Sequence, residues 1–249
     1  MAAFACIASG NWNDGPTTWG TGAGVYPGSN VAAGDTVTIG LAKDVTLNVS
    51  PPYTISTIAI SGTTAHISVA GSYTLSLTGA TGITNSSTNA GGVFQVSSGT
   101  LTLTGACATV LLSCTAAGFG IVTSGTGAAT LTNGTNAVVK NTSTGVCISH
   151  AVGTALALTG NLVTGSTTAA IVVNHASATF TMTGTVSCAT GAAHLAIIFN
   201  ACNTASITAP AGASCITNAS GTATAGLVSI AAGTLTCTGV AGATTAVSC

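Results

Sequence analysis

A short strand-like phrase occurs seven times in the second two thirds of the chain. Its copies are Leu75-Ser-Leu77-Thr-Gly, Leu101-Thr-Leu103-Thr-Gly, Ala129-Thr-Leu131-Thr-Asn, Leu156-Ala-Leu158-Thr-Gly, Phe180-Thr-Met182-Thr-Gly, Ala205-Ser-Ile207-Thr-Ala and Leu235-Thr-Cys237-Thr-Gly. The second apolar positions are separated by 26, 28, 27, 24, 25 and 30 residues. A period in this range is typical of solenoids, and alternation within each copy is typical of a strand with one buried face. The sequence therefore predicts an all-β fold, a parallel β-helix with one copy of the phrase in each coil.

Each coil contains two further apolar segments. One precedes the repeated phrase, as in Phe94-Gln-Val96, and another follows its Thr-Gly turn, as in Val110-Leu-Leu112. Three strands per coil predict a three-sided β-helix, and the crossover preference of parallel strands makes it right-handed. We expect one interior column formed by Leu77, Leu103, Leu131, Leu158, Met182, Ile207 and Cys237.

The first 35 residues contain no copy of the phrase but hold both tryptophans, Trp12 and Trp19, and two of the five prolines. The open end of a solenoid exposes core and strand edges, so we interpret residues 1–35 as an N-terminal cap or attachment segment. The β-helix itself is then expected over residues 36–249. Trp12 and Trp19 are the candidate residues at the attachment end.

Charged residues make up only 2% of the chain, and the formal net charge is −1. Binding to nucleic acid by phosphate neutralisation is therefore not expected. The chain has no run of 18 apolar residues, so no membrane-spanning helix is predicted either. Such a surface lacks the charge that normally keeps a monomer soluble. We expect neighbouring subunits to cover part of it, most simply in a homotrimer.

The few acidic residues argue against an enzyme. β-Helix lyases and glycosidases use clustered carboxylates, whereas this chain has no Glu, and its three Asp residues all precede residue 45. We interpret Asp14 as a turn or cap residue, Asp35 as the start of a strand, and Asp44 as half of a turn with Lys43. No cofactor and no catalytic residue is predicted.

Two histidines occupy nearly equivalent places on adjacent coils. His150 lies eight residues before Leu158, and His175 lies seven before Met182. Such a pair could share a metal ion or form a ring at a three-fold axis, but polar residues at an exposed strand end explain it equally simply. No metal site is predicted, and His66 and His194 have no partner in phase.

Nine cysteines are present without a CxxC pair or a zinc-like spacing. Cys237 occupies a position that holds Leu, Met or Ile in other coils, so we interpret most cysteines as small core residues. A disulfide such as Cys202–Cys215 stays open for an oxidising medium.

The outward positions of the repeated strand form a ladder of Thr-x-Thr steps. Its pairs are Ser76/Thr78, Thr102/Thr104, Thr130/Thr132, Ala157/Thr159, Thr181/Thr183, Ser206/Thr208 and Thr236/Thr238. This pattern resembles the ice-binding face of β-solenoid antifreeze proteins. The alternative is that Thr has high β-propensity and is the natural exposed residue in a chain that avoids charge.

The N-terminal segment carries a second resemblance. It reads Ser9-Gly-Asn-Trp-Asn-Asp-Gly-Pro-Thr-Thr-Trp19, then Tyr26-Pro-Gly, Gly34-Asp-Thr-Val-Thr-Ile-Gly40 and Asp44-Val-Thr-Leu47. It resembles the N-terminal module of β-helix proteins of bacterial surfaces and bacteriophage virions. The resemblance implies a structural role as a stem, fibre, adhesin or capsid decoration. A histidine often found just before the last of these strands is absent here, so any role tied to it is not carried over.

Three features of the sequence favour one of these roles over the others. The chain starts without the basic region of a signal peptide, it is nearly uncharged, and it lacks paired carboxylates. We therefore expect a non-enzymatic bacteriophage structural protein, assembled into the virion in the host cytoplasm beside the major capsid protein. A capsid decoration protein or head fibre is favoured, with a tail fibre close behind. An extracellular adhesin or filament subunit and an ice-binding protein are the alternatives.

Overall fold

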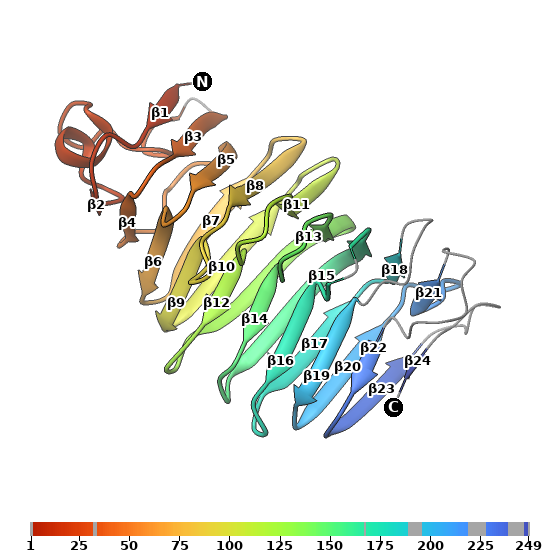
Figure 1. Cartoon of the computed structure of the whole chain (residues 1–249). Helices are drawn as coiled ribbons and strands as arrows, with labels where there is room; N and C mark the ends of the chain where they lie inside the picture. Colours follow the sequence, from red (N-terminus) through yellow and green to blue (C-terminus); the bar gives the residue numbers. More distant parts are fainter. Residues whose placement is uncertain are drawn as a thin grey trace.

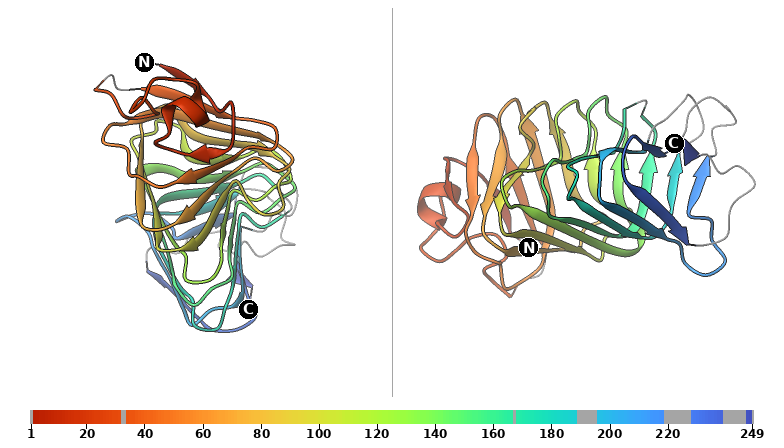
Figure 2. Two further views of the ribbon diagram at one scale, coloured as in Figure 1. Left: turned by 90° about the vertical axis from the view of Figure 1, so that its left-hand side faces the viewer. Right: turned by 90° about the horizontal axis from the view of Figure 1, so that it is seen from below.

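The structure is a computed structural model that describes residues 2–31, 34–166, 168–188, 196–218, 228–238 and 247–248 (Figure 1). In this part of the chain, parallel strands stack in register along one axis, as the repeat predicts. The view from the N-terminal end in Figure 2 shows the coils superimposed around an elongated interior. The prediction of an all-β parallel β-helix is therefore confirmed.

One side of the β-helix is a ten-stranded sheet. In order, it contains β2 (Gly10–Asn11), β4 (Asp44–Leu47), β6 (His66–Ala70), β9 (Phe94–Ser98), β12 (Ile121–Thr123), β14 (Ile148–His150), β16 (Ile171–Asn174), β19 (Ile197–Ala201), β22 (Val228–Ile230) and β24 (Val247–Ser248).

A fourteen-stranded sheet forms the other two sides. Its main path contains β1 (Ala3–Ala5), β3 (Asp35–Ile39), β5 (Ile55–Gly62), β7 (Tyr73–Leu77), β10 (Thr100–Gly105), β13 (Ala128–Asn141), β15 (Ala155–Thr164), β17 (Thr179–Thr183), β20 (Thr204–Thr208) and β23 (Thr234–Thr238). The remaining strands are β8 (Thr81–Ser87), β11 (Val110–Cys114), β18 (Val186–Cys188) and β21 (Ile216–Asn218). The long strands β5, β13 and β15 pair with both groups, so the sheet bends where they cross the corner.

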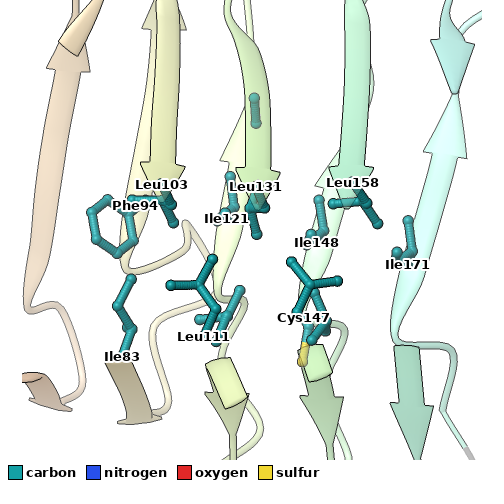
Figure 3. Close-up of a cluster of buried hydrophobic side chains, with 14 of the residues drawn as sticks. Ile83, Phe94, Leu103, Leu111, Ile121, Leu131, Cys147, Ile148, Leu158 and Ile171 are labelled. Atoms are coloured by element: carbon teal, nitrogen blue, oxygen red, sulfur yellow. The ribbon is translucent and has the colours of Figure 1, made fainter. Parts of the chain in front are cut away.

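The interior is built from apolar columns. On the main path, one column contains Leu75, Leu103, Leu131, Leu158, Met182, Ile207 and Cys237. Figure 3 shows Leu103, Leu131 and Leu158 lying beside Phe94, Ile121 and Ile148 of the ten-stranded sheet, respectively. Apart from Cys237, the members of the column are at most 2% exposed.

The expected column was wrong at its first member, and its last member, Cys237, stacks on Ile207 as expected but is not interior. Leu77 pairs with Gly105 and Ile55, and Leu75 takes the place beside Leu103. Leu77 is also buried, because the strand has two inward positions and the register there is fixed by pairing with β5. Cys237 is exposed and is not a core residue, because β23 is the last strand of its path.

Asparagine side chains close the corner after the second group of strands. Asn85 and Asn141 are fully buried in equivalent places, each beyond the last apolar position of its strand. The amide of Asn141 donates to the carbonyl oxygen of Gly145 at 3.0 Å, and its oxygen accepts the N–H of Ser143 at 3.0 Å. These bonds satisfy the backbone where the chain leaves the sheet.

The N-terminal segment adds rungs to the β-helix as well as closing it. β1 pairs in parallel with β3, and β2 pairs with β4. Between β2 and β3 lies one π-helical turn, η1 (Gly15–Trp19), whose first turn is capped by Asp14 through a 3.1 Å bond from the N–H of Thr17. The first 35 residues are thus continuous with the stack.

Candidate interaction surfaces

The outward side of β7, β10, β13, β15, β17, β20 and β23 is a regular array of small side chains, which we call the threonine face. Two of its columns are Thr74, Thr102, Thr130, Ala157, Thr181, Ser206, Thr236 and Ser76, Thr104, Thr132, Thr159, Thr183, Thr208, Thr238. The expected pair Ser76/Thr78 is wrong by two positions, for the same reason as Leu77. The sequence ladder from Thr102/Thr104 onward has the register that the strands adopt.

A third column, not anticipated from the sequence, widens the threonine face. It contains Thr100, Ala128, Ala155, Thr179, Thr204 and Thr234. The hydroxyls of Ser76 and Thr104 lie 3.0 Å apart on adjacent strands and form a hydrogen bond across the ladder. The array is therefore flat, uncharged and periodic, with hydroxyls that can bond along it.

A shallow groove runs along one edge of this face. Its volume is about 440 Å³, and it is lined by residues that include Thr159, Asn161, Thr183, Thr185 and Pro210. The amide oxygen of Asn161 accepts the N–H and the hydroxyl of Thr185 at 3.0 and 2.9 Å. Among the described residues, the lining has no His, Cys or charged side chain, so these residues offer contacts but no acid–base group.

The tryptophans lie inside the cap. Trp12 and Trp19 are 0% and 4% exposed and pack edge to face, with ring centroids 5.3 Å apart. Their indole N–H groups donate to the carbonyl oxygens of Pro27 and Trp12 at 3.1 and 2.7 Å. Phe4 packs on Trp19 at 6.2 Å. The two indoles close the end of the β-helix, and a partner attached there would contact other side chains.

Strongly exposed apolar side chains occur in the loops of the first coils. Among the described residues, the large apolar side chains that are clearly exposed are Ile7 (56%), Val31 (77%), Leu41 (79%) and Tyr53 (38%). Because β1 pairs with β3 and β2 with β4, the loops holding Ile7 and Leu41 stack on each other. We call Ile7, Val31, Leu41 and Tyr53 the apolar end. No periodic signal marks these loop residues, so sequence patterns alone could not select them.

Leu41 adopts an unusual backbone conformation, with φ +55°. It is the one described residue other than glycine with a positive φ. The left-handed conformation raises the conformational energy of a leucine by about 1–2 kcal/mol, and here it places an apolar side chain in solvent. Strain of this kind, at an exposed apolar residue, points to a role in contact.

Each aspartate has a structural partner. Asp35, only 3% exposed, accepts the N–H groups of Ala2 and Gly28 at 3.0 Å each and so fixes the start of β3. Asp44 was expected to form a turn with Lys43, but its carboxylate contacts Nε2 of His66 at 3.1 Å. Asp44 and His66 are register partners on β4 and β6, so the prediction that His66 has no partner was also wrong.

His150 and His175 do not form a matched pair. His150 is buried in the interior column of the ten-stranded sheet, where it pairs with Val173, and His175 is exposed in the loop beyond β16. His150 Nε2 donates to the carbonyl oxygen of Thr154 at 3.0 Å, and Nδ1 accepts the hydroxyl of Thr123 at 2.9 Å. The exposed strand end expected for both was therefore wrong for His150. His194 lies outside the described residues.

No metal-like cluster of three or more His, Cys, Asp or Glu side chains occurs in the part of the chain that the structure describes. Six cysteines are buried, namely Cys107, Cys114, Cys147, Cys188, Cys202 and Cys215. Burial and the neighbouring thiol of Cys114 raise the pKa of Cys147 well above its ordinary value. Cys202 and Cys215 are free thiols that contact different backbone carbonyls, so the structure does not contain the disulfide considered for them. Cys249 lies outside the described residues.

The comparisons with protein-family models, curated proteins and solved structures found no match to this chain. Among the described residues, no helix is both long and apolar enough to cross a membrane. The geometry of the surfaces is therefore the basis for any functional proposal.

Proposed function

We propose that this protein is a non-enzymatic structural protein of a bacteriophage particle, a capsid decoration protein or head fibre assembled in the host cytoplasm. The observation that carries the proposal is that the first coils of the β-helix have a different surface from the later ones. The threonine face of the later coils presents small hydroxyl and methyl groups. The strongly exposed large apolar side chains among the described residues all lie in the first 53 positions.

This difference is what an attached appendage requires. Ile7 and Leu41 supply apolar anchors on adjacent coils, and Asp14, Lys43 and Asp44 lie in the same coils. An apolar centre with polar and charged neighbours is the usual anatomy of a protein–protein interface. The attachment end is therefore assigned to the N-terminal coils, with the major capsid protein as the expected partner. The tryptophan cap keeps these coils rigid.

The proposal is tested on particles produced from the genome that encodes this chain. Mass spectrometry of purified particles should find the protein at a fixed copy number per capsid, and immunogold labelling should place it on the head. Labelling of the tail would favour a tail fibre. Absence from particles, with the protein on the cell surface, would reject the virion role in favour of an adhesin or filament subunit.

Attachment is tested with particles that lack the protein. Purified wild-type chain should rebind them, and Leu41→Asp should reduce rebinding at least tenfold because it places a charge in the apolar end. Asn200→Asp is the matched control, since Asn200 is exposed on the far coils and the substitution adds the same charge. Equal rebinding by both variants would move the attachment site away from Leu41.

Ice binding is the second candidate, and the in-register columns of the threonine face favour it. Threonines repeat at the strand spacing of about 4.8 Å on a flat, uncharged surface, which suits an ordered water layer. The test is thermal hysteresis and crystal shape in the presence of the purified protein. Faceted crystals that revert to discs with Thr104→Tyr would support this function, and unshaped crystals would reject it.

A further inference from the structure

We infer that the threonine face is the surface through which copies of this chain pack against each other. The inference rests on the proposed structural role and goes further by assigning the self-contact to one of the three sides. It commits to a second copy of this chain as the occupant of the face.

The three sides differ in charge. The ten-stranded sheet carries Asp44 and His66 at its outward positions, and the side formed by β8, β11 and β18 lies beside Lys140 of β13. The three columns of the threonine face carry neither charge nor amide side chain, because Lys140 and Asn161 lie beyond the bend of β13 and β15. Of the described surfaces it is therefore the side whose burial desolvates no ion.

Ordering the side chains of the threonine face on contact costs little entropy. Thr and Ser lose little side-chain freedom on ordering, so the entropic cost of contact is small compared with Lys or Gln. The bond between Ser76 and Thr104 shows that hydroxyls on adjacent strands can satisfy each other along the face. Threonine methyl groups are then available for packing across the interface.

The strand repeat along the face is the same in both copies. Every strand adds one row at about 4.8 Å, so two copies have the same repeat along the whole contact. Seven strands give a length of about 34 Å, and five residues per strand give a width of about 17 Å, or about 570 Å² before surface relief is counted. This is just below the lower limit of about 600 Å² per partner for a standard interface and above the ~400 Å² per partner of most crystal contacts.

A matched pair of variants tests the assignment. Thr181 on β17 and Asn174 on β16 are both exposed and belong to the same coil, but Thr181 lies on the threonine face and Asn174 is the last residue of its strand in the ten-stranded sheet. In sedimentation equilibrium, the full-length chain should be an oligomer. Thr181→Arg should weaken association at least tenfold, whereas Asn174→Arg should leave it unchanged.

Circular dichroism separates loss of association from loss of folding, and Thr104→Arg supplies a second substitution on the same face three coils earlier. The inference is overturned if both face variants assemble as the wild type does, if Asn174→Arg alone dissociates, or if the wild-type chain is monomeric. A monomer that shapes ice crystals would indicate that the threonine face binds ice instead of a second copy.

The particle measurement stays independent of this one. A chain that is present in virions but does not pack through the threonine face would overturn the inference and leave the virion proposal standing. An oligomer that dissociates with Thr181→Arg but is absent from particles would support the inference and overturn the virion proposal.

Discussion

The imidazole of His150 accepts a hydrogen bond of 2.9 Å from the hydroxyl of Thr123, on the adjacent coil. The two residues interrupt an interior column in which Val96 and Val173 stand on either side. The second ring nitrogen donates to the carbonyl oxygen of Thr154, so both nitrogens of the neutral ring have a hydrogen-bond partner. This pair is a polar unit in an apolar interior and makes the fold sensitive to protonation.

We expect the free energy of unfolding to fall on acidification because of His150. Burial, followed by the nearby His175, lowers the pKa of His150 from its ordinary value of 6.5, against an opposing effect of its bond to Thr154. Below pH 6.5 the unfolded chain binds the proton and the folded chain does not, so stability declines from there toward the lowered folded-state pKa. The slope is at most about 1.4 kcal/mol per pH unit. Urea unfolding between pH 7.5 and 5 measures it.

His150→Val is the control for this prediction, because valine matches the neighbours in the column. The difference in stability between wild type and variant should depend on pH only below about 6.5. A difference that is constant across the range would show that the acid sensitivity does not come from His150.

The repeat period was sufficient to predict the strand stacking but not the register at its first copy. In Leu75-Ser-Leu77 both leucines point inward, and only the pairing of Leu77 with Ile55 decides which of them faces Leu103. Such a decision depends on contacts between coils that differ in corner length. Local alternation carries no information about it.

Other features had signals in the sequence. Asp44 and His66 are separated by one coil, so extending the period to earlier strands could have paired them. Alternation in Ile148-Ser149-His150 places His150 inward with Ile148. By contrast, the apolar end consists of loop residues, whose exposure depends on how far each loop projects from the stack. Sequence patterns in a chain so rich in Ala, Val and Thr do not predict that projection.

Asp35→Ala should lower the free energy of unfolding by about 1–3 kcal/mol, because it leaves the buried N–H of Gly28 without an acceptor. Asp35→Asn should cost less, since an amide has one oxygen left to accept a hydrogen bond. Chemical unfolding followed by tryptophan fluorescence reports on the coil that holds Trp12 and Trp19. Equal stability of Asp35→Ala and wild type would show that the carboxylate does not fix this turn.

Two adjacent residues of β13 test which side of the strand faces inward. Leu131 is fully buried and Thr130 is half-buried on the threonine face. Leu131→Asp should prevent folding because it buries an unpaired charge, and Leu131→Ala should cost about 2–5 kcal/mol. Thr130→Asp should cost less than about 1 kcal/mol. Similar losses for Leu131→Ala and Thr130→Asp would contradict the inward column.

Leu41→Asn separates the contribution of this residue to folding from its contribution to attachment. Asparagine tolerates the left-handed conformation better than leucine, and the exposed leucine contributes little packing, so the variant should unfold with a free energy about 0.5–1 kcal/mol higher than wild type. A Cβ at position 62 would lie 2.8 Å from the Leu41 carbonyl oxygen, so Gly62 lets the backbones of the two turns pack closely, and this contact does not involve the Leu41 side chain. Rebinding to particles should nevertheless weaken, because the apolar anchor is lost. A variant that is less stable and binds normally would show that Leu41 serves the fold rather than the interface.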